Sequence, residues 1–257
     1  VCSSDLQLGV VFKPTANGSV YLSHGTSSTP VNSSMGEGSE SQSLTVTTKD
    51  LAPEENTSLE LGTKWDLLDN NVSLTGAIFR METENSRVTS ATGTAINAGT
   101  KKIEGLELGV SGNLTDSWQV MAGYTQLRSK LLNSGAINTG TTAAPVWVVG
   151  LYDGNEFPNT PERSASLWTT YKVLPSVTIG GGANYMSRVW GNTANTKWVP
   201  SYTRFDAMAS FAISKNLDLQ LNIQNLTDKV YFDKAYASHY ANIAPGRSGT
   251  LTLNLKY

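Results

Sequence analysis

The sequence predicts an all-β protein, an antiparallel β-barrel that crosses a membrane. Three observations predict it: apolar residues at every second position, a low content of charge, and connections that alternate between short and long. The clearest repeat is at residues 251–257, which read LTLNLKY and place Leu, Leu, Leu and Tyr at alternate positions. Because successive side chains of a strand point to opposite faces, one face of this strand is apolar and the other polar. In a membrane barrel the apolar face meets lipid and the polar face lines the lumen.

Composition narrows the class of protein. Charged residues make up 16% of the chain, whereas about 25% is usual in soluble domains. The sequence nevertheless has no run of about 18 apolar residues, which a transmembrane helix would need. Low charge without long apolar runs fits barrel strands, and it also fits a secreted β-sandwich, which stays open as an alternative at this point. The net charge of −2, with no basic stripe, argues against a nucleic-acid partner.

The first six residues do not share the strand pattern of the rest of the chain. Residues 1–6, VCSSDL, have no initiator Met, no basic segment and no apolar stretch of a signal peptide. We expect them to be a non-native leader, with the barrel sequence running over residues 7–257. The single cysteine, Cys2, leaves no possibility of an internal disulfide.

In the first half of the chain, alternation and turn residues predict three hairpins. Asn17-Gly18 is a hairpin signal, and Asp69-Asn70-Asn71 is a tight turn. Polar segments without alternation are predicted as long loops over 26–56 and 90–98. The predicted strands cover 9–13, 19–25, 57–68, 72–88, 101–113 and 118–131, with turns at 14–18, 69–71 and 114–117.

In the second half, two further hairpins and the terminal strand are predicted. The strand that starts at Leu217 alternates most cleanly, with Leu219, Leu221 and Ile223 on the same face. It matches the terminal strand, so the two are expected to form a closing hairpin. The predicted strands cover 163–173, 177–190, 202–213, 217–230 and 251–257, the turns 174–176 and 214–216, and the loops 132–161, 191–200 and 231–245.

The connections predict how the strands cross the membrane. Turns of about two to five residues alternate with loops of about ten to thirty, as in outer-membrane barrels with short periplasmic turns and long extracellular loops. Aromatic residues near strand ends are expected to form an interface girdle, namely Trp65, Trp118, Tyr171 and Tyr257. The strand count is about eleven, and complete single-chain barrels have even counts. The chain is therefore expected to be the C-terminal part of a larger barrel, about half of the 22 strands of plugged transporters.

From about Gly9 to Tyr257, the chain resembles the C-terminal half of the barrel of TonB-dependent ferric-siderophore receptors. The most specific motif is NIQNLTDKVY at 222–231, followed by PGR at 245–247 and the terminal aromatic residue. The loop YASHY at 236–240 is most similar to catecholate-type members. Earlier segments that are similar to the family are 11–27, 51–64, 104–108, 159–161 and 167–171.

The motifs are interpreted first as parts that build the barrel. Pro53 and the NTP motif at 159–161 lie where loops lead into strands, and proline fits there because it needs no ladder N–H. Gly105 and Gly109 are expected to let a neighbouring strand or a plug approach closely. Residues 225–228 indicate a break in the strand made by side-chain bonds to the backbone.

The resemblance implies a receptor of the bacterial outer membrane that takes up ferric siderophores with energy from TonB. It implies an N-terminal plug domain, outside residues 7–257, as the contact with the TonB complex. It also implies outer-membrane lipid and the barrel assembly machinery as partners, and it makes Tyr257 the assembly signal. The ferric siderophore is the transported ligand, and no cofactor is implied.

No catalytic or metal-binding set is predicted. The two histidines, His24 and His239, lie in no spaced cluster with Cys, Asp or Glu. We therefore expect no enzyme activity. Two other classes stay open as alternatives: a passive porin-like barrel, and a secreted β-sandwich binding module.

A receptor for an anionic ferric chelate needs cations and aromatic rings at its outer mouth. The competing interpretation is that Trp190, Trp198 and Tyr202 form an outer girdle and that Arg247 anchors the last strand. Trp198 and Arg247 also belong to the wider group of candidates. The predicted ligand-binding residues are Arg128, Trp147, Tyr152, Arg188, Trp190, Tyr236, His239 and Tyr240.

Overall fold

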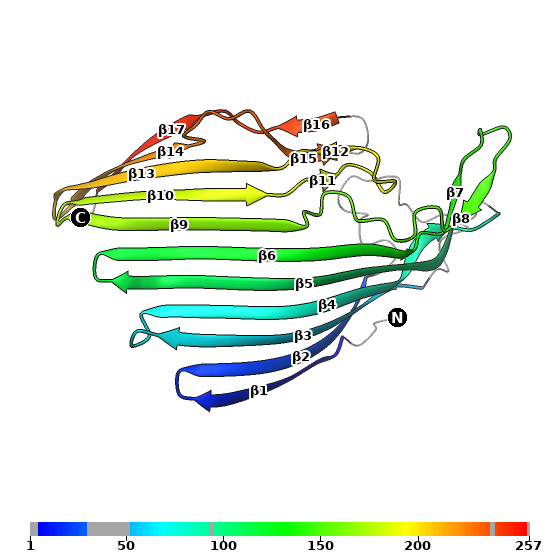
Figure 1. Cartoon of the computed structure of the whole chain (residues 1–257), viewed down its shortest axis with the longest axis horizontal. Coiled ribbons are helices and arrows are strands. Elements are labelled where there is room, and N and C mark those ends of the chain that lie inside the picture. The colour runs from blue at the N-terminus through cyan, green and yellow to red at the C-terminus, as the bar shows by residue number, and fades with distance from the viewer. Residues whose placement is uncertain (1–4, 30–51, 93–94, 237–239, 256–257) are drawn as a thin grey trace.

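The computed structural model describes residues 5–29, 52–92, 95–236 and 240–255. Within these ranges the chain forms one 11-stranded antiparallel sheet and three two-stranded sheets. Each strand of the large sheet lies beside the next one along the chain, and the sheet curves as an open partial barrel (Figure 1). The predicted antiparallel meander is confirmed.

The strands follow the chain in a simple order. The large sheet contains β1 (Gln7–Thr15), β2 (Gly18–Thr29), β3 (Glu54–Leu67), β4 (Val72–Thr89), β5 (Ala95–Thr115), β6 (Trp118–Asn133), β9 (Arg163–Leu174), β10 (Val177–Met186), β13 (Tyr202–Ser214), β14 (Leu217–Gln224) and β17 (Ser248–Leu255). The small sheets pair β7 (Ala136–Asn138) with β8 (Trp147–Val149), β11 (Val189–Trp190) with β12 (Trp198–Val199), and β15 (Phe232–Tyr236) with β16 (Tyr240–Ile243).

The connections are sorted between the two ends of the sheet. The short turns, at 16–17, 68–71, 116–117, 175–176 and 215–216, all lie at the end drawn on the left of Figure 1. The three small sheets lie toward the opposite end, which we call the loop end (Figure 1). The predicted asymmetry between short turns and long loops is therefore confirmed.

Several strands run further toward the loop end than predicted. Thr29 pairs with Glu54, so both ends of the predicted loop 26–56 lie in the ladder. Likewise β5 begins at Ala95, inside the predicted loop 90–98. Both segments are rich in polar residues, so they lack alternation although their backbones stay paired. Hydrophobic periodicity marks only the part of a strand that has an apolar face.

Two predicted strands end early, and three predicted loops contain strands. The predicted strand 177–190 leaves the large sheet after Met186, and β11 joins a different sheet. The predicted strand 217–230 ends at Gln224, because Asn225 and Asp228 adopt positive φ angles of 52° and 51°. The small strands within the predicted loops are too short for two-residue alternation to be recognised.

The two faces of the large sheet differ in polarity. Residues directly opposite in the ladder share a face, and Leu221 pairs with Leu251 while Gln220 pairs with Thr252. Leu221 and Leu251 are 40% and 66% exposed. A soluble sheet would bury such side chains, whereas a membrane barrel turns them toward lipid. We call the face with Leu221 the outward face and the face with Gln220 the inner face.

On the inner face, aromatic rings lie over glycines of the neighbouring strand. Tyr21 is directly opposite Gly62, and a Cβ at Gly62 would lie 2.3 Å from the Tyr21 ring. Gly105 makes the same room for Phe79, whose ring would lie 2.4 Å from an added Cβ. The close approach expected at Gly105 is therefore made by a side chain of the adjacent strand.

Replacing Gly62 with Ala is expected to lower the free energy of unfolding by about 1–3 kcal/mol, the usual cost of overpacking. The Tyr21 ring would have to move, and its hydroxyl would leave Glu60, to which it donates a 2.6 Å hydrogen bond. The urea midpoint of the full-length protein in detergent measures the change. Gly123→Ala is the matched control, because its added Cβ meets no atom closer than 3.5 Å. Equal midpoints for the two variants would contradict the packing described.

Candidate functional site

At the loop end, two of the small sheets share a hydrophobic core. Val189, Val199 and Ala235 are only 2–3% exposed and come from β11, β12 and β15. Met186, Phe232 and Ala241 pack against them. We call the body formed by residues 155–161, 187–200, 231–236 and 240–244 the loop cluster.

Asn159, in the NTP motif, ties three connections of the loop cluster together. Its side-chain amide donates to the carbonyl of Ala235 at 2.8 Å and accepts from the amide of the same residue at 2.9 Å. Its own backbone amide donates to the carbonyl of Trp190 at 2.8 Å. Its φ of 54° lies in the left-handed region, which Asn tolerates better than most residues. The motif thus serves to dock loops as well as to lead into β9.

A cation and two indole rings meet on the surface of this body. The Arg188 guanidinium lies 4.3 Å from the centroid of the Trp190 ring. The Trp198 ring stands edge-on to Trp190, with centroids 6.2 Å apart and an interplanar angle of 84°. Arg188 and Trp198 are both exposed. We call Arg188, Trp190 and Trp198 the aromatic–cation group.

Side-chain amides hold the hairpin that carries this group. Asn195 accepts from the backbone amide of Glu156 at 2.8 Å and donates to its carbonyl at 3.0 Å. Asn192 accepts from the amides of Thr196 and Lys197 at 3.1 and 3.3 Å. The backbone around Glu156 is therefore fixed against the hairpin between β11 and β12.

Glu156 contacts the candidate site, although the sequence did not reveal it. Its carboxylate accepts a 3.1 Å hydrogen bond from the indole N–H of Trp190. This bond fixes the orientation of the Trp190 ring. Within the described residues, Glu156 forms no ion pair with Arg188. A single Glu in a polar loop carries no local signal, so only the fold brings it to Trp190.

The other predicted ligand residues lie at different places on the loop end. Trp147 is on β8, opposite Asn138, in a hairpin that projects away from the loop cluster (Figure 1). Tyr152 lies in the turn at 150–154, where its amide donates to Ser134. Tyr240 is on β16, 54% exposed, opposite Tyr236 in the ladder.

Some predicted residues fall where the structure makes no statement. His239 and Tyr257 lie outside the described residues, and of Tyr236 only the backbone is described. Arg247 is described: its amide donates to Asp228 at 2.8 Å, and its guanidinium donates to the Leu226 carbonyl at 3.5 Å. These bonds tie the segment before β17 to the end of β14, as the anchoring interpretation expected.

Arg128 lies on a strand of the large sheet rather than in a loop. It lies on β6 with the same alternation as Trp118, Ala122 and Tyr124, whose ladder partners include Tyr171 and Leu167 of the apolar surface. Arg128 therefore belongs to the outward face, beyond the apolar residues, whereas its neighbour Ser129 accepts a hydrogen bond from the Phe157 amide of the loop cluster.

A partly buried polar network joins the loop cluster to the inner face of β13. Arg204 donates to the carboxylate of Asp206 at 2.8 Å, and the other oxygen of Asp206 accepts from the amide of Asn225 at 2.9 Å. The rings of Tyr202 and Tyr231 lie 4.3 Å apart, and Arg204 also donates to the Tyr231 hydroxyl. The spacing of Arg204 and Asp206, two residues apart on one strand face, is a signal that could have indicated this network.

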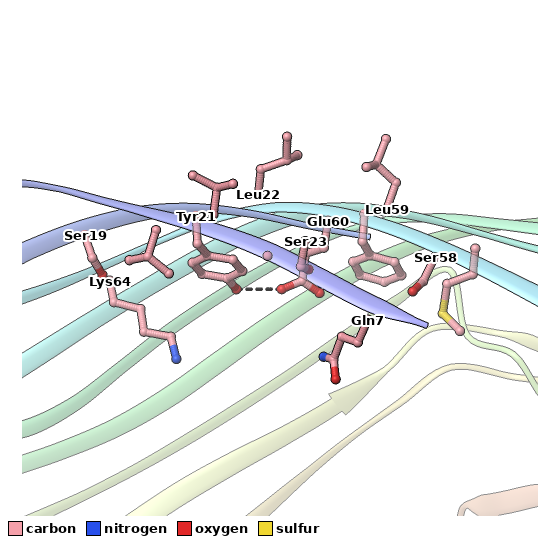
Figure 2. Close-up of a pocket in the computed structure, with 14 residues that line it drawn as sticks. Gln7, Ser19, Tyr21, Leu22, Ser23, Ser58, Leu59, Glu60 and Lys64 are labelled. Atoms are coloured by element: carbon pink, nitrogen blue, oxygen red, sulfur yellow. Dashed lines mark hydrogen bonds between the residues drawn. The ribbon is translucent and has the colours of Figure 1, made fainter. Parts of the chain in front are cut away.

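The inner face also carries a pocket of about 640 Å³ near the β1 edge. Figure 2 shows Tyr21, Glu60 and Lys64 on the pocket side of the strands, while Leu22 and Leu59 point the other way. The Lys64 ammonium lies 5.8 Å from the Tyr21 ring centroid. The pocket therefore offers a ligand one acid, one amine and a hydroxyl that is already bonded to that acid.

Metal clusters and membrane-spanning helices are both absent from the described ranges. These ranges contain no group of three or more His, Cys, Asp or Glu side chains that could hold a metal ion. They also contain no helix with the length and hydropathy of a membrane span.

The chain matches the sequence model of the family "TonB dependent receptor-like, beta-barrel" over residues 6–226. It is 51% identical over 252 residues to the probable TonB-dependent siderophore receptor PiuA of Acinetobacter baumannii, covering 98% of this chain and 33% of that protein. It is 31% identical over 259 residues to the catecholate siderophore receptor Fiu of Escherichia coli, covering 97% of this chain and 32% of that protein.

Solved structures agree with these relatives. The crystal structure of PiuA superimposes with a TM-score of 0.91 at 50% identity, over 98% of this chain and 35% of that one. The closed form of Fiu superimposes with a TM-score of 0.80 at 29% identity, over 97% and 34%. The chain thus spans about a third of the length of the relatives that it matches.

Proposed function

The chain belongs to the TonB-dependent receptor β-barrel family, and we propose that the protein containing it takes up ferric siderophores with energy supplied through TonB. The chain itself is part of an outer-membrane barrel. The observation that carries the proposal is the aromatic–cation group on a docked loop cluster at the extracellular end. The names of two relatives, a probable siderophore receptor and a catecholate siderophore receptor, support the same class of ligand.

The chemistry of the group suits a ferric catecholate. Such a ligand is anionic and presents flat aromatic rings. Arg188 supplies a positive charge, and Trp198, which is 59% exposed, supplies an open ring face. Because the iron arrives already chelated, no protein metal ligands are required. The proposed contact surface also includes Trp147, Tyr152, Trp190, Tyr236, His239 and Tyr240.

The remaining parts of the proposal concern the rest of the protein. We propose that residues 1–6 are not native and that a plug domain, which contacts TonB, lies outside residues 7–257. Barrel assembly through Tyr257 and contact with outer-membrane lipid are part of the same proposal. We assign the protein no catalytic role, because its relatives are transport receptors. A passive porin is less well supported, since a porin has no need for a docked aromatic–cation group.

The double variant Arg188→Gln, Trp198→Ala is expected to weaken uptake of a ferric catecholate by tenfold or more. Removing a charge-assisted contact costs about 1.5–3 kcal/mol, and about 1.4 kcal/mol corresponds to tenfold in affinity. Uptake of radioactive iron by iron-limited cells, with the variant as their sole siderophore receptor, measures the effect. Lys197→Gln is the matched control, because Lys197 is exposed in the same hairpin beside Trp198.

Two results would count against the proposal. Uptake that continues at the native rate in the double variant would remove the aromatic–cation group from the ligand site. Uptake that persists in cells without TonB would indicate a passive barrel. The control variant should match the native protein in both strains.

A further inference from the structure

The outward face of the large sheet contains an apolar hollow of about 570 Å³ that spans β4, β5, β6, β9 and β10. Small side chains create it. Ala165 on β9 is directly opposite both Tyr124 on β6 and Tyr185 on β10. Two residues closer to the turns along each strand, Ala122 and Ala183 lie on either side of Leu167. The hollow is thus a gap between larger residues of the lipid-facing surface.

The hollow lies near the middle of the apolar band, on the lipid-facing side of the sheet. Trp118 marks the turn end of β6, and Arg128 follows about ten residues later, roughly 33 Å along the strand. With a strand tilt of about 40°, this is roughly 25 Å across the membrane, the height of the apolar band of such barrels. Ala122 lies nearer to Trp118 and Tyr124 nearer to Arg128, so the hollow is centred between these levels, at a depth that the acyl chains of the outer leaflet reach.

Basic side chains stand on the same face, four and six residues beyond Tyr124 toward the loop end. Arg128 and Lys130 follow Tyr124 along β6 and are both exposed. Their direct neighbours on β5 are Glu104 and Lys102. Within the described ranges, Glu104 forms ion pairs with Lys102 at 3.1 Å and with Arg80 at 3.9 Å, and neither Arg128 nor Lys130 has an ion pair.

We propose that the hollow, together with Arg128 and Lys130, binds a phosphorylated lipid of the outer leaflet. The acyl chain fills the gap around Ala165, and the phosphate accepts hydrogen bonds from Arg128 and Lys130. The two cations are two residues apart on one face, roughly 7 Å, so both can reach one phosphate. Charge complementarity selects this occupant, since unpaired cations at the lipid boundary favour an anionic headgroup.

The lipid is tested on the full-length protein, extracted from the outer membrane in mild detergent. Native mass spectrometry counts the bound lipids, and fragmentation identifies their phosphate groups. In the double variant Arg128→Gln, Lys130→Gln, the retained phosphorylated lipid is expected to fall about tenfold or more. Lys172→Gln with Lys215→Gln removes two charges near the turn end of β9 and β13 and should leave the bound lipid unchanged.

A second variant tests the hollow without changing charge. Ala165→Phe fills the gap and is expected to reduce bound lipid several-fold, whereas Ala209→Phe, on the outward face but outside the hollow, should not. Heat-modifiable migration on gels confirms that each variant is folded. Equal lipid content in all variants overturns the proposal. The proposal is also overturned if the native protein retains phosphate-free lipid as well as it retains phosphorylated lipid. A changed oligomeric state in Ala165→Phe, with the amount of bound lipid unchanged, overturns it as well.

Discussion

Replacing Leu221 with Arg is expected to cost about 2–4 kcal/mol of folding free energy and to deplete the folded barrel from the outer membrane. Leu221 lies on the outward face, 40% exposed, between Ala209 and Leu251 in the ladder. A charge there must be carried into the hydrocarbon layer. Folding of the full-length protein into lipid vesicles, followed across a urea series, measures the cost.

Gln220→Arg is the matched control because it introduces the same charge one residue away. Gln220 lies on the inner face, opposite Thr252, where an arginine meets polar groups. Its urea midpoint should stay near that of the native protein. If the two variants were equally destabilised, or if Gln220→Arg were the worse, the assignment of the two faces would be reversed or void.

Replacing Asn225 with Leu is expected to destabilise the barrel by about 3 kcal/mol or more. Asn225 is 1% exposed. Its side chain accepts from the amide of Lys229 and donates to the carbonyl of that residue, both at 2.9 Å, and it also donates to Pro245. Leucine would leave these partly buried backbone groups without their hydrogen-bond partner, at up to about 1–3 kcal/mol each. It would also have to adopt a positive φ, here 52°.

The same urea series measures the Asn225→Leu variant. Asn222→Leu, on the same strand, is the control. Asn222 accepts a hydrogen bond from the Gln220 side chain but none from a loop backbone, so a loss below about 1 kcal/mol is expected. Asn225→Leu with the stability of this control would mean that the break after β14 is held by something other than the Asn225 side chain.

The strands could be predicted because lipid on one side of the sheet forces alternation. The lipid-facing positions must be apolar, as at Leu219, Leu221 and their partners on β17. This requirement produces an alternation that can be recognised within a short stretch of sequence. The parity of alternation also carries information about faces. Arg128 lies ten positions after Trp118 and four after Tyr124, so the sequence alone could have placed it on the outward face.

The loop cluster could not be predicted, because its contacts join segments that are far apart in the chain. Asn159 and Ala235 are 76 residues apart, and nothing in either segment indicates the other. No local signal marks the point where β11 leaves the large sheet, since residues 186–190 contain neither Gly nor Pro. The pairing of Glu156 with Trp190 follows only once the hairpin between β11 and β12 has docked.

The bonds of Asn159 to Ala235 and Trp190 bear on how strongly a ligand can be held. They join three extracellular connections into one body before any ligand arrives. Ordering a free loop costs about 1–2 kcal/mol of conformational entropy for each residue fixed. Where folding has already ordered the loops, binding does not have to supply that free energy, and the ligand contacts proposed at Arg188 and Trp198 would translate more fully into affinity. Under the proposed function, the docked loops would form a preorganised receptor surface.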